Sequence, residues 1–105
     1  MTGVVFHPLA DRELMEAARF YESRAVGLGG DFVREVERAL GQIIANPDAG
    51  SVLAGTVRRR LVRRFPFAIL YQTGSENVSV IALMHLHRRP GYWTRRMRDI
   101  PQTES

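Results

Sequence analysis

Two apolar runs separated by a short turn constrain the fold of this chain more than any other feature. In the first run, FPFAILYQ at 65–72, every second residue is large and apolar, which predicts a strand with one apolar face. In the second run, VSVIALMHLH at 78–87, positions 80 to 84 are all apolar, so we expect a central strand covered on both faces. TGSEN at 73–77 has the composition of a hairpin turn. Together the two runs predict a β-hairpin.

The N-terminal quarter predicts a strand followed by a helix. Residues 3–7 (GVVFH) are a short β-branched and aromatic run that ends at Pro8, as a first strand would. From residue 9 to residue 25, apolar side chains recur at helical spacing and charged side chains occupy the other side, which indicates an amphipathic helix. The apolar positions are Leu14, Ala17, Ala18 and Tyr21.

A second helix is expected after a glycine-rich break. VGLGG at 26–30 interrupts the helical pattern, because glycine readily adopts backbone angles that helices do not use. We expect Asp31 to cap the new helix and the NP at 46–47 to end it. Its apolar stripe consists of Phe32, Val36, Ala39, Leu40 and Ile43. The two helices therefore predict a helical hairpin.

The remaining segments complete a C-terminal half that is rich in strands. Residues 48–55 are expected to form a loop, TVRRRLVRR at 56–64 a strand, and 92–98 a short helix or turn. The predicted order is strand, helix, helix, strand, strand, strand, which is an α+β fold. No repeat or linker divides the chain, and 105 residues are enough for one core, so we expect a single domain over 1–105.

The composition excludes several classes of protein. Cysteine is absent, which excludes a disulfide framework, a thiolate metal site and a cysteine nucleophile, and fits a reducing compartment. The N-terminus has no basic and apolar export signal, and no apolar run reaches the length of a membrane span. We therefore expect a cytoplasmic protein with no membrane partner.

Charge is distributed unevenly along the chain. Residues 1–54 carry five arginines and eight acidic residues, whereas 55–98 carry ten arginines and only Glu76. The C-terminal half is thus expected to present a positive surface to a polyanion or an acidic partner. All fifteen basic residues are arginine, and an arginine guanidinium can bind phosphate or carboxylate through two hydrogen bonds.

The stretch HLHRRPGYW at 85–93 gathers two of the three histidines beside arginines and aromatic residues. On a strand, His85 and His87 would point to the same side, but a metal ion needs about three protein ligands, and no cysteine or carboxylate pair is adjacent. We therefore expect no metal and no cofactor. A catalytic role and a packing role for this stretch both remain open.

Four motifs follow one another along nearly the whole chain. After the early strand come GLGGDFVREVERALGQIIANP from Gly27 to Pro47, RRLVRRFPFAILY from Arg59 to Tyr71, and HLHRRPGYWTRR from His85 to Arg96. This series resembles the RelE/ParE superfamily of bacterial toxins. The resemblance implies a small, mainly antiparallel sheet packed on a helical hairpin. It also implies a type II toxin–antitoxin pair, in which a cognate antitoxin protein binds and silences the toxin in a hetero-oligomer.

The resemblance leaves three functions open. The chain can be a ParE-like toxin that arrests growth by binding DNA gyrase on cleaved DNA, which is a binding activity without a catalytic centre. It can be a RelE-like ribonuclease that cleaves mRNA on the ribosome. It can also be a degenerate member that survives as an interaction module. Superfamily ribonucleases typically carry lysine in the basic run, and this chain has no lysine. This difference favours the gyrase hypothesis.

The ribonuclease hypothesis implies a defined set of catalytic residues. Attack of a ribose 2′-OH on the neighbouring phosphate needs a base, an acid and cations for the charge of the phosphorane. His85 and Tyr92 would exchange the protons. Arg88, together with Arg58 or Arg60, would stabilise the negative charge.

The alternative is that the same stretch is scaffold beside a binding surface. In that case His85 ends a strand, Arg88 pairs with an acid of the first helix, and Trp93 fills one end of the core. The basic run would then be a solvated strand face or would bind the acidic tail of the antitoxin. The residues expected to bind a partner or nucleic acid are Arg59, Arg63, Arg64, Arg89, Arg95 and Arg96.

Overall fold

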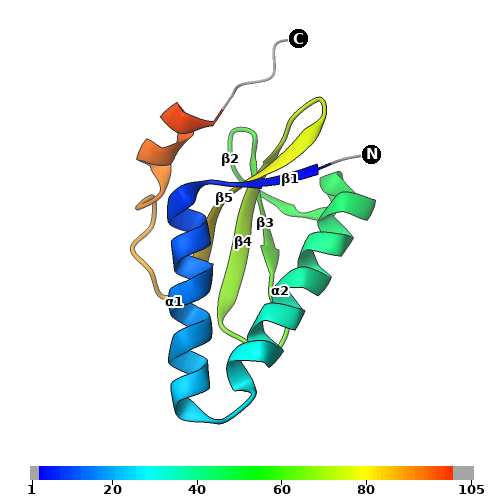
Figure 1. Ribbon diagram of the computed structural model, residues 1–105. Coiled ribbons are helices and arrows are strands. Elements are labelled where there is room, and N and C mark those ends of the chain that lie inside the picture. The colour runs from blue at the N-terminus through cyan, green and yellow to red at the C-terminus, as the bar shows by residue number, and fades with distance from the viewer. Residues whose placement is uncertain (1–2, 101–105) are drawn as a thin grey trace.

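The computed structural model describes residues 3–100 and shows two helices packed on one face of a five-stranded sheet (Figure 1). The elements are β1 (Gly3–Phe6), α1 (Pro8–Arg24), α2 (Leu28–Ala45), η1 (Pro47–Ala49), β2 (Ser51–Ala54), β3 (Val57–Leu61), β4 (Phe67–Thr73), β5 (Asn77–His85) and η2 (Thr94–Asp99). The predicted α+β class and the order of the predicted elements are confirmed. Among residues 3–100, no helix is long and apolar enough to cross a membrane.

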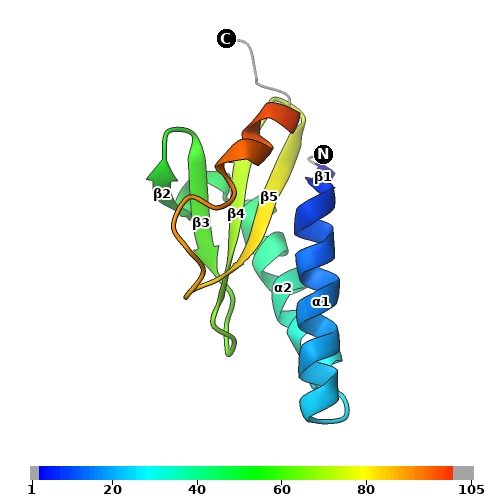
Figure 2. The same ribbon diagram turned by 90° about the vertical axis from the view of Figure 1, so that its left-hand side faces the viewer.

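The strands lie in the order β1-β5-β4-β3-β2, and only β1 and β5 run parallel. The sheet is therefore mainly antiparallel, as expected. The turn at 73–77 joins β4 to β5, which confirms the predicted hairpin. After β5, the chain crosses the face of the sheet that points away from the helices and forms η2 (Figure 2).

The prediction of a loop over 48–55 is wrong in part, because residues 51–54 form the edge strand β2. Its four residues show no alternation, and all four are exposed. They form a strand because they pair with β3, with a shift of register between Val52 and Ala54. β3 in turn ends at Leu61, earlier than the predicted residue 64, because the chain turns at 62–66 and Arg64 adopts a left-handed conformation with φ of 71°.

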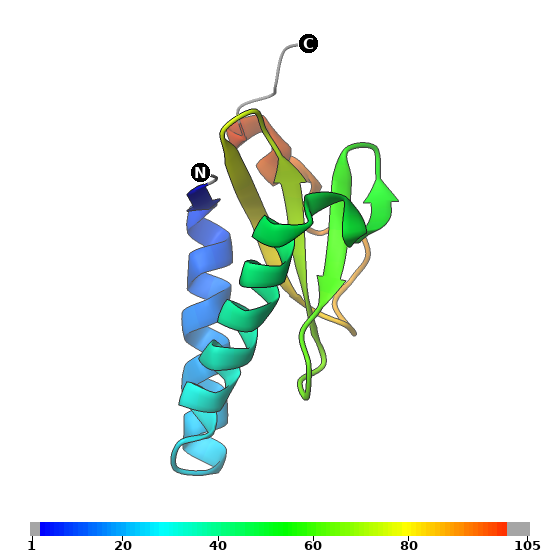
Figure 3. The ribbon, with the colours of Figure 1, turned by 90° about the vertical axis from the view of Figure 1, so that its right-hand side faces the viewer.

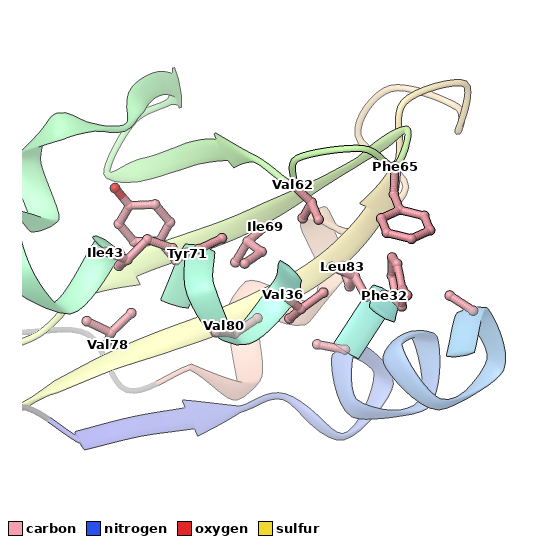
Figure 4. Packing of buried hydrophobic residues seen from close by; sticks show 13 residues of the cluster. Phe32, Val36, Ile43, Val62, Phe65, Ile69, Tyr71, Val78, Val80 and Leu83 are labelled. Carbon is pink, nitrogen blue, oxygen red and sulfur yellow. The ribbon is translucent and has the colours of Figure 1, made fainter. Parts of the chain in front are cut away.

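The predicted apolar stripe of the second helix packs on the sheet (Figure 4). Phe32, Val36 and Ile43 of α2 are buried in one cluster with Ile69 and Tyr71 of β4. Ala39 is buried there too, and Leu40 and Phe67 pack against the cluster. Burying each large side chain stabilises the fold by about 1.5–3 kcal/mol, so this cluster is the main core.

β5 is buried on both faces, as its uniform apolar run predicts. Val80 and Leu83 belong to the core under the helices, whereas Ala82 and Met84 belong to a second cluster on the opposite face. The change of face follows from a bulge: Tyr71 pairs with Val80 and Leu70 with Ala82, which leaves Ile81 as the extra residue. Trp93 and Ile100 cover the second cluster.

The two helices form the predicted hairpin, but α2 begins earlier than expected (Figure 3). It starts at Leu28, and Asp31 lies inside its first turn. The cap comes from α1: the Glu22 carboxylate accepts hydrogen bonds from the backbone N–H groups of Gly27 (2.9 Å) and Gly29 (3.0 Å). The negative charge also favours this helix N-terminus. The prediction of Asp31 as the cap is wrong because a side chain of the preceding helix already satisfies these N–H groups.

Candidate functional site

His85 ends β5, and its ring is held by its neighbours. The ring packs edge-on against Phe67 of β4, with centroids 5.1 Å apart. Its Nδ1 accepts a hydrogen bond from the backbone N–H of His87 at 3.0 Å. The rings of the two histidines are 5.3 Å apart. Within residues 3–100, no three His, Asp or Glu side chains are grouped as a metal ion would require.

Glu13 of α1 is the centre of the most extensive side-chain network of the described residues. Its carboxylate accepts two hydrogen bonds from the Arg96 guanidinium, at 2.8 and 2.9 Å, and one from the Tyr92 hydroxyl at 2.8 Å. It also accepts the backbone N–H of Leu83 at 3.1 Å. Arg96 donates further to the carbonyl oxygen of Ile81 at 3.1 Å. The network therefore joins α1, β5 and the C-terminal segment.

This network satisfies backbone groups on the part of the β5 edge that β1 does not cover. β1 pairs with β5 only as far as Phe6 and Val80, so the edge of β5 beyond that point lacks a backbone partner. Arg96 satisfies a carbonyl group on this edge and Glu13 satisfies an N–H group. Buried backbone groups need such partners, because leaving one unpaired costs about 1–3 kcal/mol. Arg96 is 8% exposed, so its guanidinium has an internal role.

The same network raises the pKa of the Tyr92 hydroxyl. Burial raises the pKa of the Tyr92 hydroxyl, and the hydrogen bond to the Glu13 carboxylate raises it further, while Arg96 and Arg88 oppose the change to a smaller extent. The phenol therefore keeps its proton at neutral pH. For Arg96, burial acts to lower the pKa, but the hydrogen bonds and charge of Glu13 outweigh it and the pKa is raised.

Arg88 lies over the Tyr92 ring, with its guanidinium carbon 4.0 Å from the ring centroid. Under the packing alternative, Arg88 pairs with an acid of the first helix. Instead Arg96 forms that ion pair, because η2 brings residue 96 against α1 whereas residue 88 lies in the turn just after β5. The companion prediction for Trp93 is confirmed, since this residue is 5% exposed in the second cluster.

The three arginines of β3 are divided between the faces of the sheet. Arg58 donates to the carbonyl oxygens of Asp48 (3.0 Å) and Gly50 (2.7 Å), and Arg60 donates to Gln42 of α2 at 3.0 Å. Both lie on the helix side. Arg59, between them in sequence, faces the other side, as the alternation of a strand requires. Arg58 and Arg60 are therefore separated from His85 by β4 and its core residues.

The remaining basic residues of the prediction lie at the surface. Arg63 and Arg64 are in the turn between β3 and β4, where Arg64 approaches Asp31 of α2 at 3.7 Å. Arg89 and Arg95 are exposed in the segment that follows β5. These four residues remain candidates for partner binding. Arg96 does not join them, because it is buried and paired with Glu13.

Two cavities flank the sheet near the end of β5. A cavity of about 370 Å³ on the helix side lies between α1 and the sheet and is lined by His85, Arg88, Glu13 and Glu16, with apolar residues such as Phe20 around them. A second cavity, of about 400 Å³, lies on the opposite face. We call it the β2 groove and define it by Leu53, Arg59, Met84, Leu86, Arg88 and Trp93.

The two cavities differ in what they can do chemically. The helix-side cavity contains His85, but its two glutamates disfavour a phosphate backbone, and Glu13 is engaged by Arg96. The β2 groove contains two arginines, and none of its lining residues is a histidine, an acid or a tyrosine that could transfer a proton. Of the arginines that the ribonuclease hypothesis names, only Arg88 lines the cavity that contains His85.

Sequence reasoning missed Glu13 and the β2 groove. A signal for Glu13 was present, because it lies at helical spacing between Ala10 and Ala17, the two fully or nearly buried residues of α1. A carboxylate on the buried side of a helix requires a partner. No comparable signal marked the groove, because it depends on the unexpected strand β2.

The fold is that of a small α+β protein with a cavity on each face of its sheet. Residues 4–90 match the family described as the ParE toxin of the type II toxin-antitoxin system, parDE. The chain therefore belongs to the ParE toxin family, and the predicted resemblance to RelE/ParE toxins is confirmed. A solved structure titled "Chromosomal ParDE TA system from P. aeruginosa" has the same fold, with a TM-score of 0.69, 16% identity, and coverage of 83% of this chain and 98% of that chain. No curated protein matches the sequence.

Proposed function

We propose that this toxin arrests growth by binding DNA gyrase in the cytoplasm, and that a cognate antitoxin neutralises it in a hetero-oligomer. The observation that carries the proposal is the separation of His85 from the arginines of β3. His85 lies in the helix-side cavity, whereas Arg59 lies in the β2 groove. The Arg58 guanidinium donates to the carbonyl oxygen of Gly50, and the Arg60 guanidinium donates to Gln42 of α2.

A ribonuclease needs these groups at one phosphate. The base and the acid must be within hydrogen-bond reach of the 2′-OH and the leaving oxygen, and the cations must reach the oxygens that gain charge. The Tyr92 hydroxyl donates a hydrogen bond to Glu13, and the raised pKa of this phenol makes it a poor acid. Only Arg88 borders both cavities. The arrangement therefore favours a toxin that acts by binding.

The positive surface suits a target that is bound to DNA. Arg59, Arg63, Arg89 and Arg95 have no carboxylate partner among residues 3–100. Unpaired arginines at a surface attract polyanions and speed encounter with them at low salt. Gyrase presents such a surface while it holds cleaved DNA.

Exposed apolar side chains support an antitoxin partner. Met15 and Phe20 of α1 are 48% and 51% exposed, and Leu61 of β3 and Leu86 after β5 are 58% and 41% exposed. These side chains lie on separate elements, and a partner that covers them removes apolar surface from water. A partner that covers them while its acidic residues pair with the arginines would silence the toxin.

Controlled induction of the chain in bacteria tests this proposal. Growth should stop, intracellular plasmid should show breaks that depend on gyrase, and mRNA on ribosomes should remain intact. Coexpression of the protein encoded by the adjacent reading frame should restore growth. Growth arrest with ribosome-dependent mRNA cleavage and intact plasmid would contradict the gyrase target. Failure of every adjacent gene product to restore growth would contradict antitoxin control.

A further inference from the structure

We propose that Arg95 and Arg98 of η2 bind the phosphate backbone of duplex DNA, so that this toxin contacts the DNA itself as well as the gyrase that holds it. The choice of DNA among polyanions rests on the proposed function. Three features of the C-terminal segment, residues 86–100, carry the inference. They are a free face of η2, positive charge that the fold does not neutralise, and aromatic rings that are already covered.

Two residues of η2 fasten this short helix to the N-terminal part of the chain. Because side chains three residues apart in a 3₁₀ helix lie on the same side, Arg96 and Asp99 share one face of η2. Arg96 donates to the Glu13 carboxylate at 2.8 Å. The Asp99 carboxylate lies 2.8 Å from Nε2 of His7. η2 accordingly lies beside the N-terminal end of α1, and this face is occupied by the fold (Figure 1).

A second face of η2 packs on the sheet, which leaves the third face free. Ile100, just after η2, belongs to the second cluster, and Met97 packs against that cluster. Arg95 and Arg98 share the remaining face, and both are exposed. A rise of about 2 Å per residue places them about 6 Å apart along the helix axis. Neither takes part in the contacts that fix η2, so the pair is free to bind a ligand.

The C-terminal segment carries more positive charge than the fold neutralises. It contains five arginines and one acid. Arg95 and Arg98 form no ion pair with an acid of the described part of the chain. Both line a cavity of about 280 Å³, together with Leu9, Arg96 and Asp99. Because the Asp99 carboxylate is already engaged by the fold, this surface presents net positive charge to an anion.

The spacing and exposure of the pair favour a polyanion over a single anionic group. One ion pair at an exposed position contributes little, because water and salt screen it. A phosphodiester backbone offers charges in series, and neutralising them releases condensed counterions, which drives binding. Two arginines about 6 Å apart along a helix can contact successive phosphates of one strand. Such contacts position a protein on DNA without reading the base sequence.

The aromatic rings of the C-terminal segment are covered, which disfavours unpaired bases as the ligand. Proteins bind single strands by stacking the bases on aromatic side chains. Trp93 is 5% exposed and belongs to the second cluster. The guanidinium carbons of Arg88 and Arg96 lie 4.0 and 5.0 Å from the centroid of the Tyr92 ring. The surface of η2 therefore suits the backbone of a duplex better than single-stranded RNA.

Fluorescence anisotropy of a labelled DNA duplex, titrated with the chain at several salt concentrations, tests the inference. The double variant Arg95→Gln/Arg98→Gln should bind about tenfold or more weakly at low salt. Its slope of log affinity against log salt should be smaller by about 1.8, because each phosphate contact contributes about 0.9. Arg95→Lys/Arg98→Lys retains both charges and should keep most of the slope.

The matched control is Arg19→Gln/Arg24→Gln, which removes the same charge from exposed positions on α1. These positions lie toward the α1–α2 turn, at the other end of the molecule from η2 (Figure 1). The control should therefore keep the slope of the unmodified chain. Circular dichroism of each variant verifies folding.

Three results would overturn the inference. One is no binding of the duplex, or equal losses in the two glutamine double variants, which would show that net charge alone matters. Another is an oligouridylate that binds more tightly than the duplex with the same dependence on Arg95 and Arg98, which would indicate RNA. The last is polyglutamate that binds more tightly than the duplex with this dependence, which would indicate an acidic protein segment.

The gyrase assay separates this inference from the proposed function. Arg95→Gln/Arg98→Gln should require more chain than the control variant to give the same amount of gyrase-dependent linear DNA. Equal dose dependence of the two variants would contradict the inference and leave the proposed function standing. Duplex binding through the arginine pair, without any gyrase-dependent breaks, would contradict the proposed function alone.

Discussion

Arg96 binds the carboxylate of Glu13 through its two terminal guanidinium nitrogens, at 2.8 and 2.9 Å, although the two residues are 83 positions apart in sequence. The pair is shielded from water, since the two side chains are 9% and 13% exposed. It fastens the C-terminal segment over the sheet, and that segment forms one wall of the β2 groove. The shape of the groove therefore depends on this ion pair.

Removing one charge of the pair should destabilise the domain strongly. Glu13→Gln leaves the buried Arg96 guanidinium without a counter-charge, and breaking a buried pair in this way costs about 3–5 kcal/mol. Glu16→Gln, at an exposed position on the same helix, is the matched control and should change stability little. Urea unfolding measures the free energy of unfolding of both variants. Equal stability of Glu13→Gln and the unmodified chain would show that the pair does not hold the segment.

Two glycine-to-alanine changes should have opposite effects. A Cβ at Gly50 would clash with the Tyr71 hydroxyl, which donates to the carbonyl oxygen of Pro47 at 2.7 Å. Gly50→Ala should therefore destabilise by about 1–3 kcal/mol. Gly41 is exposed inside α2, with no atom within 4 Å of its added Cβ. Gly41→Ala should stabilise by about 0.5–1 kcal/mol. Thermal unfolding of the two variants shows whether the stability falls in Gly50→Ala and rises in Gly41→Ala.

Stability should fall at high pH through Tyr92. Burial and the hydrogen bond to Glu13 raise the pKa of Tyr92 above the ordinary value of 10.0. The folded protein thus binds this proton more tightly than the unfolded chain does. The resulting stability is complete below the unfolded pKa and is lost as pH rises through the folded pKa. Urea unfolding between neutral pH and pH of about 11 should show this decline, and Tyr92→Phe should reduce its slope. An unchanged slope in Tyr92→Phe would contradict the assignment.

Trp93 and His85 should respond differently to truncation. Trp93→Ala removes a large buried side chain from the second cluster and should cost about 3–5 kcal/mol through the cavity that it leaves. His85 lies partly exposed at the end of β5, so His85→Ala should remain folded. It should also arrest growth as the unmodified chain does. Loss of arrest in a folded His85→Ala protein would indicate that this histidine has a direct role.

Periodicity explains which parts of the fold could be predicted. The stripe from Phe32 to Ile43 and the alternation in β4 are local patterns that burial imposes on every helix or strand of this kind. β2 has no such pattern, because pairing with β3 makes it a strand. The start of α2 was predicted too late for a similar reason, since its cap comes from Glu22 in the other helix.

The candidate site was harder to predict because it depends on contacts between distant segments. Alternation places Arg59 opposite Arg58 and Arg60, but the sequence does not reveal which face the helices cover. Likewise, nothing local distinguishes Arg96, which is buried against α1, from the exposed Arg95 beside it. Both distinctions require the packing of α1 and the C-terminal segment on the sheet.

Cleavage of supercoiled plasmid by purified gyrase tests the central proposal most directly. The chain is added to gyrase, ATP and plasmid, the reaction is stopped with detergent, and linear DNA is measured. The proposal predicts that linear DNA accumulates only when gyrase and the chain are both present, and equally with His85→Ala. No gyrase-dependent linear DNA, together with cleavage of ribosome-bound mRNA that His85→Ala abolishes, would contradict it and establish a ribonuclease.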